Sequence, residues 1–308
     1  MYCVNGKYFA NLYRNRISGY AEWCDSALCC GFYFNADNIG PYMSLDGTCL
    51  SNGEVWRFLT NKDGHGGRGT LAAAIPGTKS NDIISILVGA MGKSLRRKVK
   101  EVICDLSPSM MLIAAEVFCN PHVVNDRFHV RQIYSEAVDE IRIDIRRQLI
   151  AGDNNRAKSV PPTVYSNGET MRRILARSKH TLMMSQNKWT DTQRHRVNIL
   201  FKRYPILRNA YNLAIELPQI FNAKISPTKA LRRMNRWYER VMELGNNNFR
   251  SVIMTFKNHA PTILNYFRRR STNASAEAFN SKVKIFRSQM RGVRDRDFFI
   301  FRLVKLYA

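Results

Sequence analysis

The spacing of apolar residues changes along the chain, and this change restricts the fold more than any other feature. Residues 41–50, 54–62 and 70–75 each show the alternation or apolar run of a strand. A three-residue turn separates the first two, and a glycine-rich loop separates the second from the third. Connections this short join antiparallel neighbours, so the segment predicts a three-stranded meander.

The pattern then becomes helical and alternates between helix and strand. Residues 83–91 repeat apolar side chains at helical spacing, and residues 98–106 predict a buried strand. A helix over 107–118 with Ser107 as its N-cap and a strand over 122–126 follow. Three strands, helix, strand, helix, strand is the order of the ribonuclease H-like fold, and this order alone names no function.

A long helical region separates this core from the last helix of the chain. About a hundred residues without a strand pattern are too many for a loop, so we expect an all-helical insertion. The predicted division is a mostly helical segment over 1–40, the first part of an α/β ribonuclease H-like core over 41–150, a helical insertion over 151–265, and C-terminal helices over 266–308 that complete the core.

The charge of the chain predicts a polyanionic partner. It has 48 Lys and Arg against 24 Asp and Glu, which gives +24, and residues 151–308 hold 31 basic and 9 acidic residues, or +22. We expect double-stranded DNA before a membrane, with an affinity that falls steeply with salt. The alternative is a soluble basic protein without such a partner. No apolar run approaches the roughly 18 residues of a membrane span.

The seven cysteines show no CxxC spacing. We expect reduced thiols in a cytosolic protein, consistent with a cytoplasmic location. A zinc site built from Cys24, Cys29 and Cys30 is the alternative.

Two aspartates are expected to meet on the core sheet. In a ribonuclease H-like fold the fourth strand pairs with the first, which brings Asp105 at the end of one beside Asp46 in the middle of the other. Asp46 shares a strand face with Tyr42 and Ser44, while Met43 and Leu45 point to the other face. We therefore expect the carboxylate to face the site rather than the core.

The last helix, expected to open near Asn273, carries a third acid. An apolar stripe would pack on the sheet, and Glu277 lies on the neighbouring face. The alternative for Glu277 is a first-turn acid that complements the helix dipole. The rest of that face suits the binding of DNA phosphates and comprises Asn280, Lys284, Arg287 and Arg291.

Three clustered carboxylates in a basic protein predict a site for divalent cations. Asp46, Asp105 and Glu277 would repel one another without metal, and carboxylate oxygens are the ligands that Mg²⁺ and Mn²⁺ prefer. Two such ions can stabilise the attacking and leaving oxygens of a phosphoryl displacement.

Four segments together resemble a known family. They are SLDGTCLSNGEV, ICDLSPSM, NDRFHV and RSTNASAEAFNSKVKIFRSQMRGVRDRDFFIFRL. They are similar to the catalytic part of bacterial insertion-sequence transposases of the ISL3 type, closest to the ISAon-like branch, over roughly residues 1–308. The resemblance implies a DDE triad of Asp46, Asp105 and Glu277 and metal-dependent cleavage and strand transfer of DNA at the element ends, in the bacterial cytoplasm at the nucleoid.

The resemblance also singles out residues outside the triad. Asp126 and His129 form a D-x-x-H motif near the site, for which the alternative is an N-cap Asp with a packed His. Relatives often carry a second acid where this chain has Gly47, which weakens the expected metal binding. Trp189 is a candidate for stacking on a flipped base, as is Trp237, and the alternative for both is a place in the core.

No zinc-finger spacing or helix-turn-helix pattern precedes Asp46. The resemblance therefore implies that a separate N-terminal protein supplies end recognition. Two ends need two active sites, so we expect a dimer on DNA. Two alternatives remain: a structure-directed nuclease of the same fold, and a DNA-binding transposase relic with weakened catalysis.

Overall fold

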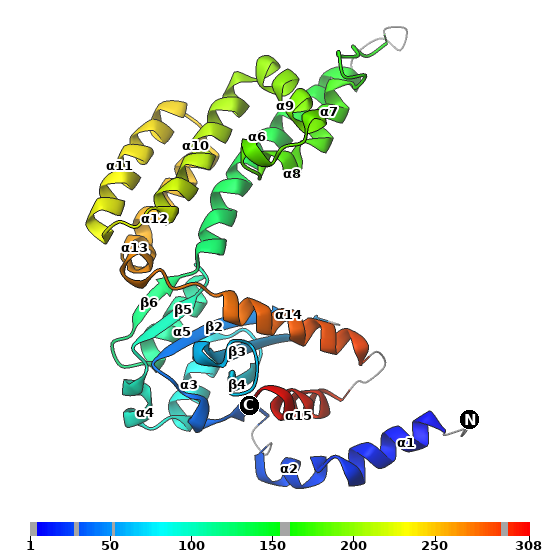
Figure 1. Ribbon diagram of the computed structural model, residues 1–308, viewed down its shortest axis with the longest axis vertical. Helices are drawn as coiled ribbons and strands as arrows, with labels where there is room; N and C mark the ends of the chain where they lie inside the picture. The colour runs from blue at the N-terminus through cyan, green and yellow to red at the C-terminus, as the bar shows by residue number, and fades with distance from the viewer. Residues whose placement is uncertain (1–4, 28–30, 51–52, 155–160, 291–294) are drawn as a thin grey trace. The chain divides into compact units, whose positions relative to one another are not determined.

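The computed structural model describes residues 5–27, 31–50, 53–154, 161–290 and 295–308, and the chain forms two compact units (Figure 1). Unit 1 comprises Met1–Asp126 and Ser271–Ala308, and unit 2 comprises Arg127–Arg270.

Unit 1 contains a six-stranded mixed sheet with the strand order β1-β4-β3-β2-β5-β6. Strands β2, β3, β4 and β1 are antiparallel neighbours, whereas β5 runs parallel to β2 and to β6. This confirms the ribonuclease H-like order expected from the sequence. The strands are β1 (Tyr33–Phe34), β2 (Tyr42–Cys49), β3 (Val55–Asn61), β4 (Leu71–Pro76), β5 (Glu101–Cys104) and β6 (His122–Asn125).

Helices cover both faces of this sheet. On one face Met43 and Leu45 of β2 join a buried cluster with residues of α3 (Ser80–Ala90) and α5 (Pro108–Val117). On the other face Phe58 of β3 packs edge to face on Phe279 of α14 (Ala274–Gln289), in a cluster that includes α15 (Arg296–Tyr307). The other helices of unit 1 are α1 (Gly6–Leu12), the π-helical segment Tyr13–Ile17, α2 (Tyr20–Ala27), α4 (Lys93–Lys98) and the short 3₁₀ segments Ala36–Asn38 and Lys62–Gly64.

The strand predicted over 98–106 is shorter in the structure. It covers Glu101–Cys104, because the preceding basic residues form α4 and Asp105 begins the turn into α5. The predicted start of α5 is confirmed: Ser107 accepts a hydrogen bond from the Met110 N–H, and a proline occupies the first turn.

Unit 2 is entirely helical apart from one isolated β-bridge within its described residues. Its boundary differs from the predicted 151–265, because the 28-residue α6 (Arg127–Asn154) packs against α7, α10 and α12 rather than on the sheet. The remaining helices are α7 (Met171–Arg177), α8 (Lys179–Leu182), the 3₁₀ segment Gln186–Lys188, α9 (Asp191–Arg203), α10 (Pro205–Asn222), α11 (Pro227–Leu244), α12 (Asn247–Asn258) and α13 (Ala260–Arg269).

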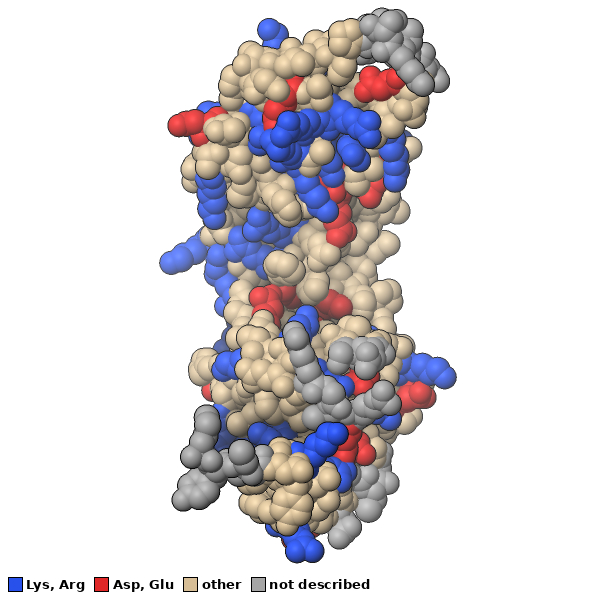
Figure 2. Space-filling view, turned by 90° about the vertical axis from the view of Figure 1, so that its right-hand side faces the viewer, with Lys and Arg blue, Asp and Glu red and all other residues tan. Residues whose placement is uncertain are grey.

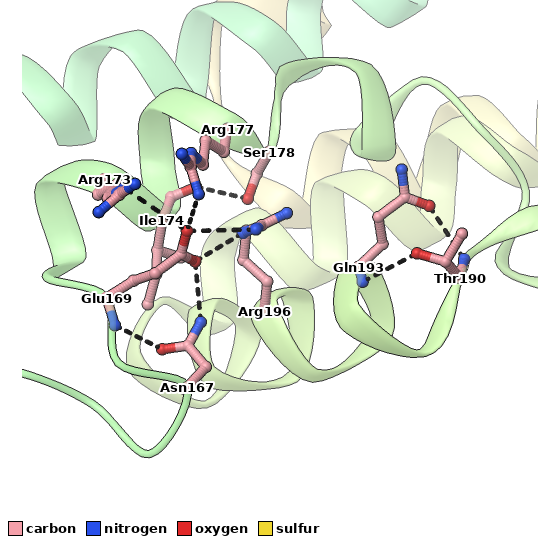
Figure 3. A network of polar contacts seen from close by, with 9 residues as sticks. All are labelled: Asn167, Glu169, Arg173, Ile174, Arg177, Ser178, Thr190, Gln193 and Arg196. Atoms are coloured by element: carbon pink, nitrogen blue, oxygen red, sulfur yellow. Dashed lines mark hydrogen bonds and ion pairs between the residues drawn. The ribbon is translucent and has the colours of Figure 1, made fainter.

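One buried carboxylate in unit 2 accepts hydrogen bonds from two arginines (Figure 3). Glu169 lies just before α7, and its oxygens accept from Arg177 Nη1 at 2.7 Å and from Arg196 Nε of α9 at 2.7 Å. Asn167 Nδ2 donates to it at 2.9 Å, and Arg173 lies 3.9 Å away. The hydrogen bonds from Arg196, which contributes most, and from Arg177 lower the pKa of the Glu169 carboxyl. The cluster joins α7 to α9.

The cysteines that the structure describes, at positions 24, 49, 104 and 119, are free thiols. Cys29 and Cys30, which the zinc alternative needs, lie outside the described residues, as does Cys3. Of the helices in the described part of the chain, none has the length and apolarity that a membrane span requires.

Candidate active site

Three aspartates of unit 1 lie at the level where β5 and β6 end: Asp46 is in β2, Asp105 directly follows β5 and Asp126 directly follows β6. The register pairs Ser44 of β2 with Ile103 of β5, and two residues further along Asp46 comes beside Asp105. Cys104 of β5 is paired with Asn125 of β6, so Asp105 and Asp126 follow at the next position. Adjacent strands are separated by about 4.8 Å. The register therefore places these three residues on neighbouring strands or directly after them.

Helix α14 contacts Asp46 through two asparagines. The Asp46 Oδ2 atom accepts hydrogen bonds from Asn280 Nδ2 at 2.7 Å and from Asn273 Nδ2 at 3.3 Å, while Oδ1 accepts from the Gly47 N–H at 2.7 Å. Both asparagines are buried, at 1% exposure for Asn273 and 8% for Asn280. The carboxylate is therefore held by neutral amide donors.

Glu277 lies between these two asparagines on the helix. Residues 273, 277 and 280 follow the spacing i, i+4, i+7, and the Glu277 N–H donates to the Asn273 carbonyl at 2.9 Å. Neighbours three or four residues apart on a helix have Cβ atoms about 5–6 Å from one another. The helix face that carries Glu277 is therefore the face that contacts Asp46. The Glu277 side chain itself is exposed.

Asp126 is connected to the same helix. Its side chain is buried, and Oδ1 accepts a hydrogen bond from the Asn273 N–H at 3.3 Å. Asn273, the N-cap residue of α14, thus donates to Asp126 through its main chain and to Asp46 through its side chain. In the D-x-x-H motif, the His129 ring packs edge to face on the Phe128 ring.

The negative charge of these three aspartates affects the pKa of the nearby Cys104 thiol. Burial, followed by the negative charges of Asp105, Asp46 and Asp126, raises the pKa of Cys104 to about 12. A thiolate at the end of β5 would be repelled by all three carboxylates.

The chain matches one family model, described as a transposase, over residues 44–303. It belongs to the ISL3 transposase family. No curated protein matches the chain, and no solved structure does. The matched span covers both the strand that carries Asp46 and the helix that carries Glu277.

The transposase site has oxygen donors suited to Mg²⁺, but they are not gathered around one point. Within the described residues no group of three His, Cys, Asp or Glu side chains is placed to hold a metal ion. Both Asp46 oxygens accept hydrogen bonds, and Asp105 Oδ1 accepts one from the Ser107 N–H at 2.9 Å. The amide oxygens of Asn273 and Asn280 are buried and accept no hydrogen bond. Carboxylate and amide oxygens are ligands that Mg²⁺ accepts, so the donor chemistry of these residues fits such a cation.

Gly47, the position where an acid was expected from relatives, leaves room for an arginine. A Cβ atom at this position would lie 1.7 Å from Arg57 Nη1 and 3.3 Å from Met110 Cε. Arg57 is the residue of β3 paired with Gly47. A larger side chain at position 47 thus requires Arg57 to move.

The predicted DNA contacts divide into exposed and buried residues. Lys284 is exposed, and it follows Asn280 on the same helix face. Arg287 is buried at 7% exposure, pairs with Glu54 at 3.3 Å and lies over the Phe299 ring, so its guanidinium is not presented to DNA. Asn280 binds Asp46 instead of a phosphate. Arg291 lies outside the described residues.

The two tryptophans considered for base stacking, Trp189 and Trp237, belong to the core of unit 2. Trp189 is 7% exposed, donates to the Thr181 carbonyl at 2.9 Å and packs on Tyr211. Trp237 is fully buried and donates to the Leu213 carbonyl at 2.8 Å. Stacking of Trp189 on a flipped base is therefore not supported, and the alternative, a core residue, describes both rings.

The sequence interpretation did not assign the connection between Asn273, Asp46 and Asp126. The helical spacing of Asn273, Glu277 and Asn280 places all three on one face of the helix, and this spacing could have indicated the connection. Asn280 was interpreted as a phosphate contact, because a sequence does not show which strand the helix covers.

Unit 2 carries most of the positive charge of this transposase. Residues 127–270 contain 28 Lys and Arg against 10 Asp and Glu, so they supply +18 of the total +24. Figure 2 shows Lys and Arg side chains gathered over the part of the surface that this unit forms. Transposases bind DNA, and this surface is electrostatically suited to it.

Proposed function

We propose that this protein is a DDE transposase that cleaves DNA at the ends of an insertion sequence and joins the freed 3′ ends to target DNA. Asp46, Asp105 and Glu277 are the proposed triad. One observation carries the proposal: the helix face that displays Glu277 is hydrogen-bonded on both sides of it to Asp46, and Asp46 is level with Asp105.

Each acid has a distinct support. The Asn273 and Asn280 amides orient Asp46, and the Ser107 N–H in the turn into α5 orients Asp105. Glu277 is exposed on the first turn of α14. These three residues would hold two Mg²⁺ or Mn²⁺ ions. When bound, the ions would supply charge stabilisation at the phosphate and a more acidic water.

Lys284 has a positioning role in this proposal. It continues the face of Asn273, Glu277 and Asn280 and lies seven residues, about 10 Å, beyond Glu277 along the helix. An exposed ammonium at that distance can bind a backbone phosphate near the reacting bond and set the register of the strand without reading bases.

The deciding experiment uses DNA whose element end is already cleaved, incubated with target DNA and Mg²⁺. Wild-type protein should join the two, whereas Asp46→Asn, Asp105→Asn and Glu277→Gln should each reduce joining by at least about 10³-fold while Mn²⁺ binding, measured by calorimetry, also falls. Glu243→Gln, on an exposed face of α11, is the matched control.

Other outcomes would identify the alternatives. Cutting of intact DNA without joining would identify a structure-directed nuclease. DNA binding with neither reaction would identify a relic. Wild-type joining by Glu277→Gln would remove this residue from the triad.

Finer assignments are proposals as well. The four segments quoted from the sequence support the ISAon-like branch. The need to process two element ends supports a dimer on DNA, and a DNA substrate in a bacterium places the protein at the nucleoid. End recognition by a separate protein stays a prediction.

A further inference from the structure

Helix α11 of unit 2 presents a basic stripe on its exposed side. We define the stripe by four residues, Lys229, Arg232, Arg233 and Arg236, which follow the spacing i, i+3, i+4, i+7 and are all exposed. The opposite side of the helix is buried and consists of Ala230, Met234, Trp237, Tyr238 and Val241. Because this apolar side is fixed in the core, the basic stripe necessarily faces outward.

The stripe has no acidic compensation within the described part of the chain. None of its four side chains forms an ion pair there, whereas Arg240, one turn further, pairs with Glu216 of α10, with 2.8 Å between Nη1 and Oε1. The acids of the helix, Glu239 and Glu243, come only in its last turns.

This distribution of charge disfavours the helix that carries it. Like charges three and four residues apart repel one another. Cations also interact unfavourably with the positive end of the helix dipole, and Lys229 lies in the first turn while Glu243 lies in the last. The stability of the helix alone would favour acids in the first turn and basic residues in the last. Binding of an external polyanion is the simplest explanation for the observed order of charges.

We propose that the basic stripe binds the phosphate backbone of double-stranded DNA without reading its sequence. From position 229 to 236 the helix rises about 10 Å. One DNA strand presents a phosphate about every 3.4 Å along the axis, so the stripe spans about three phosphates. Arginine and lysine side chains in a row along a helix suit such a repeating partner. The proposal rests on DNA as the substrate of the proposed function, but not on the triad.

The test measures binding of a 30-base-pair duplex of arbitrary sequence to the full chain, by fluorescence anisotropy in EDTA over a range of KCl. The variant replaces all four stripe residues, K229A/R232A/R233A/R236A. Alanine favours the helix and leaves the buried side unchanged, so the fold should persist. A second variant, R232Q/R236Q, gives a smaller change of the same kind should the first unfold.

The control removes the same charge from unit 1, by K93A/R97A/K98A/K100A, at four exposed positions of α4 and the residues after it. The stripe variant should lower the salt dependence, the slope of log K against log[KCl], by about 3, and lower affinity near 0.1 M KCl by about 100-fold. The control should change the slope by less than about 1.

Three outcomes would overturn the proposal: a wild-type slope in the stripe variant, an equal loss in the control, or loss of binding to phosphatidylserine vesicles with DNA binding unchanged. The proposed function is tested separately. Glu277→Gln should keep the wild-type slope while it loses joining, so a failure of the triad and a failure of the stripe give different results.

Discussion

Replacement of Glu169 tests how much its arginine cluster stabilises unit 2. The Glu169 side chain is 8% exposed and that of Arg196 is 12% exposed, whereas Arg177 and Arg173 are about half exposed at 49% and 58%. Breaking a buried ion pair costs about 3–5 kcal/mol, because the remaining charge loses its partner without gaining water. Exposed pairs contribute about 0–1 kcal/mol. Of these contacts, only the one between Glu169 and Arg196 is a buried ion pair.

Glu169→Ala should therefore reduce the free energy of unfolding by about 3–4 kcal/mol, and Glu169→Gln by about 2 kcal/mol, since the amide keeps the shape and one acceptor oxygen. The assay is urea unfolding at pH 7, followed by circular dichroism. Glu216→Ala is the matched control: its pair with Arg240 is 30% and 48% exposed, so it should cost less than about 1 kcal/mol.

The pH dependence gives a second check. The pKa of Glu169 is lowered in the folded state, so its contribution is complete above the unfolded value of about 4.3 and is lost as pH falls through the folded pKa. The stability difference between wild type and Glu169→Gln should shrink below pH 4. Equal stability of the two proteins at pH 7, or a difference that grows in acid, would refute the assignment of stabilisation to the ionised carboxylate.

Further predictions concern the site and the core. Asn280→Ala removes a 2.7 Å hydrogen bond to Asp46 and should raise the Mg²⁺ concentration needed for half-maximal joining several-fold. Lys284→Ala should instead raise the DNA concentration needed for half-maximal joining. Equal Mg²⁺ curves for wild type and Asn280→Ala would contradict the first prediction. Trp189→Ala should lower unfolding free energy by about 3–5 kcal/mol and Trp189→Phe by less, measured by urea unfolding, because the ring fills core space. Cys104, with its pKa raised to about 12, should resist iodoacetamide at pH 8, while the exposed Cys49 should react. Mass spectrometry of the labelled peptides measures both reactions. Labelling of Cys104 at pH 8 would show that its thiol is accessible and ionised.

The sheet was predictable because its signals are local. Alternation and glycine-rich turns gave β2, β3 and β4, and proline with Ser107 gave the start of α5. Strand β1 has two residues, too few to show a period, and it is defined by pairing with β4. The boundary of unit 2 depends on what α6 packs against, and an amphipathic helix does not reveal its partner in the sequence.

The candidate site was predictable only in outline. The position of Asp105 beside Asp46 followed from the strand order of the fold, in which β5 pairs with β2. Arg287 was interpreted as a phosphate contact because it lies on a polar helix face, but Glu54 and Phe299 come from distant segments and bury it. Such tertiary partners decide whether a cation is available to DNA, and helical spacing does not contain them.

Several acids of this strongly basic protein have arginine partners, and Asp46 also accepts hydrogen bonds from amides. Asp295 pairs with Arg14, Glu54 with Arg287 and Glu169 with its arginines, so guanidinium groups compensate these charges and the acids act in structure. The three hydrogen bonds to Asp46 described above come from amides.

A neutral donor orients a carboxylate as well as a cationic one does, but it adds no charge to cancel that of the carboxylate. Carboxylate oxygens are also the ligands that Mg²⁺ prefers. The asparagines on either side of Glu277 therefore orient Asp46 toward the helix face that carries the third acid of the proposed triad.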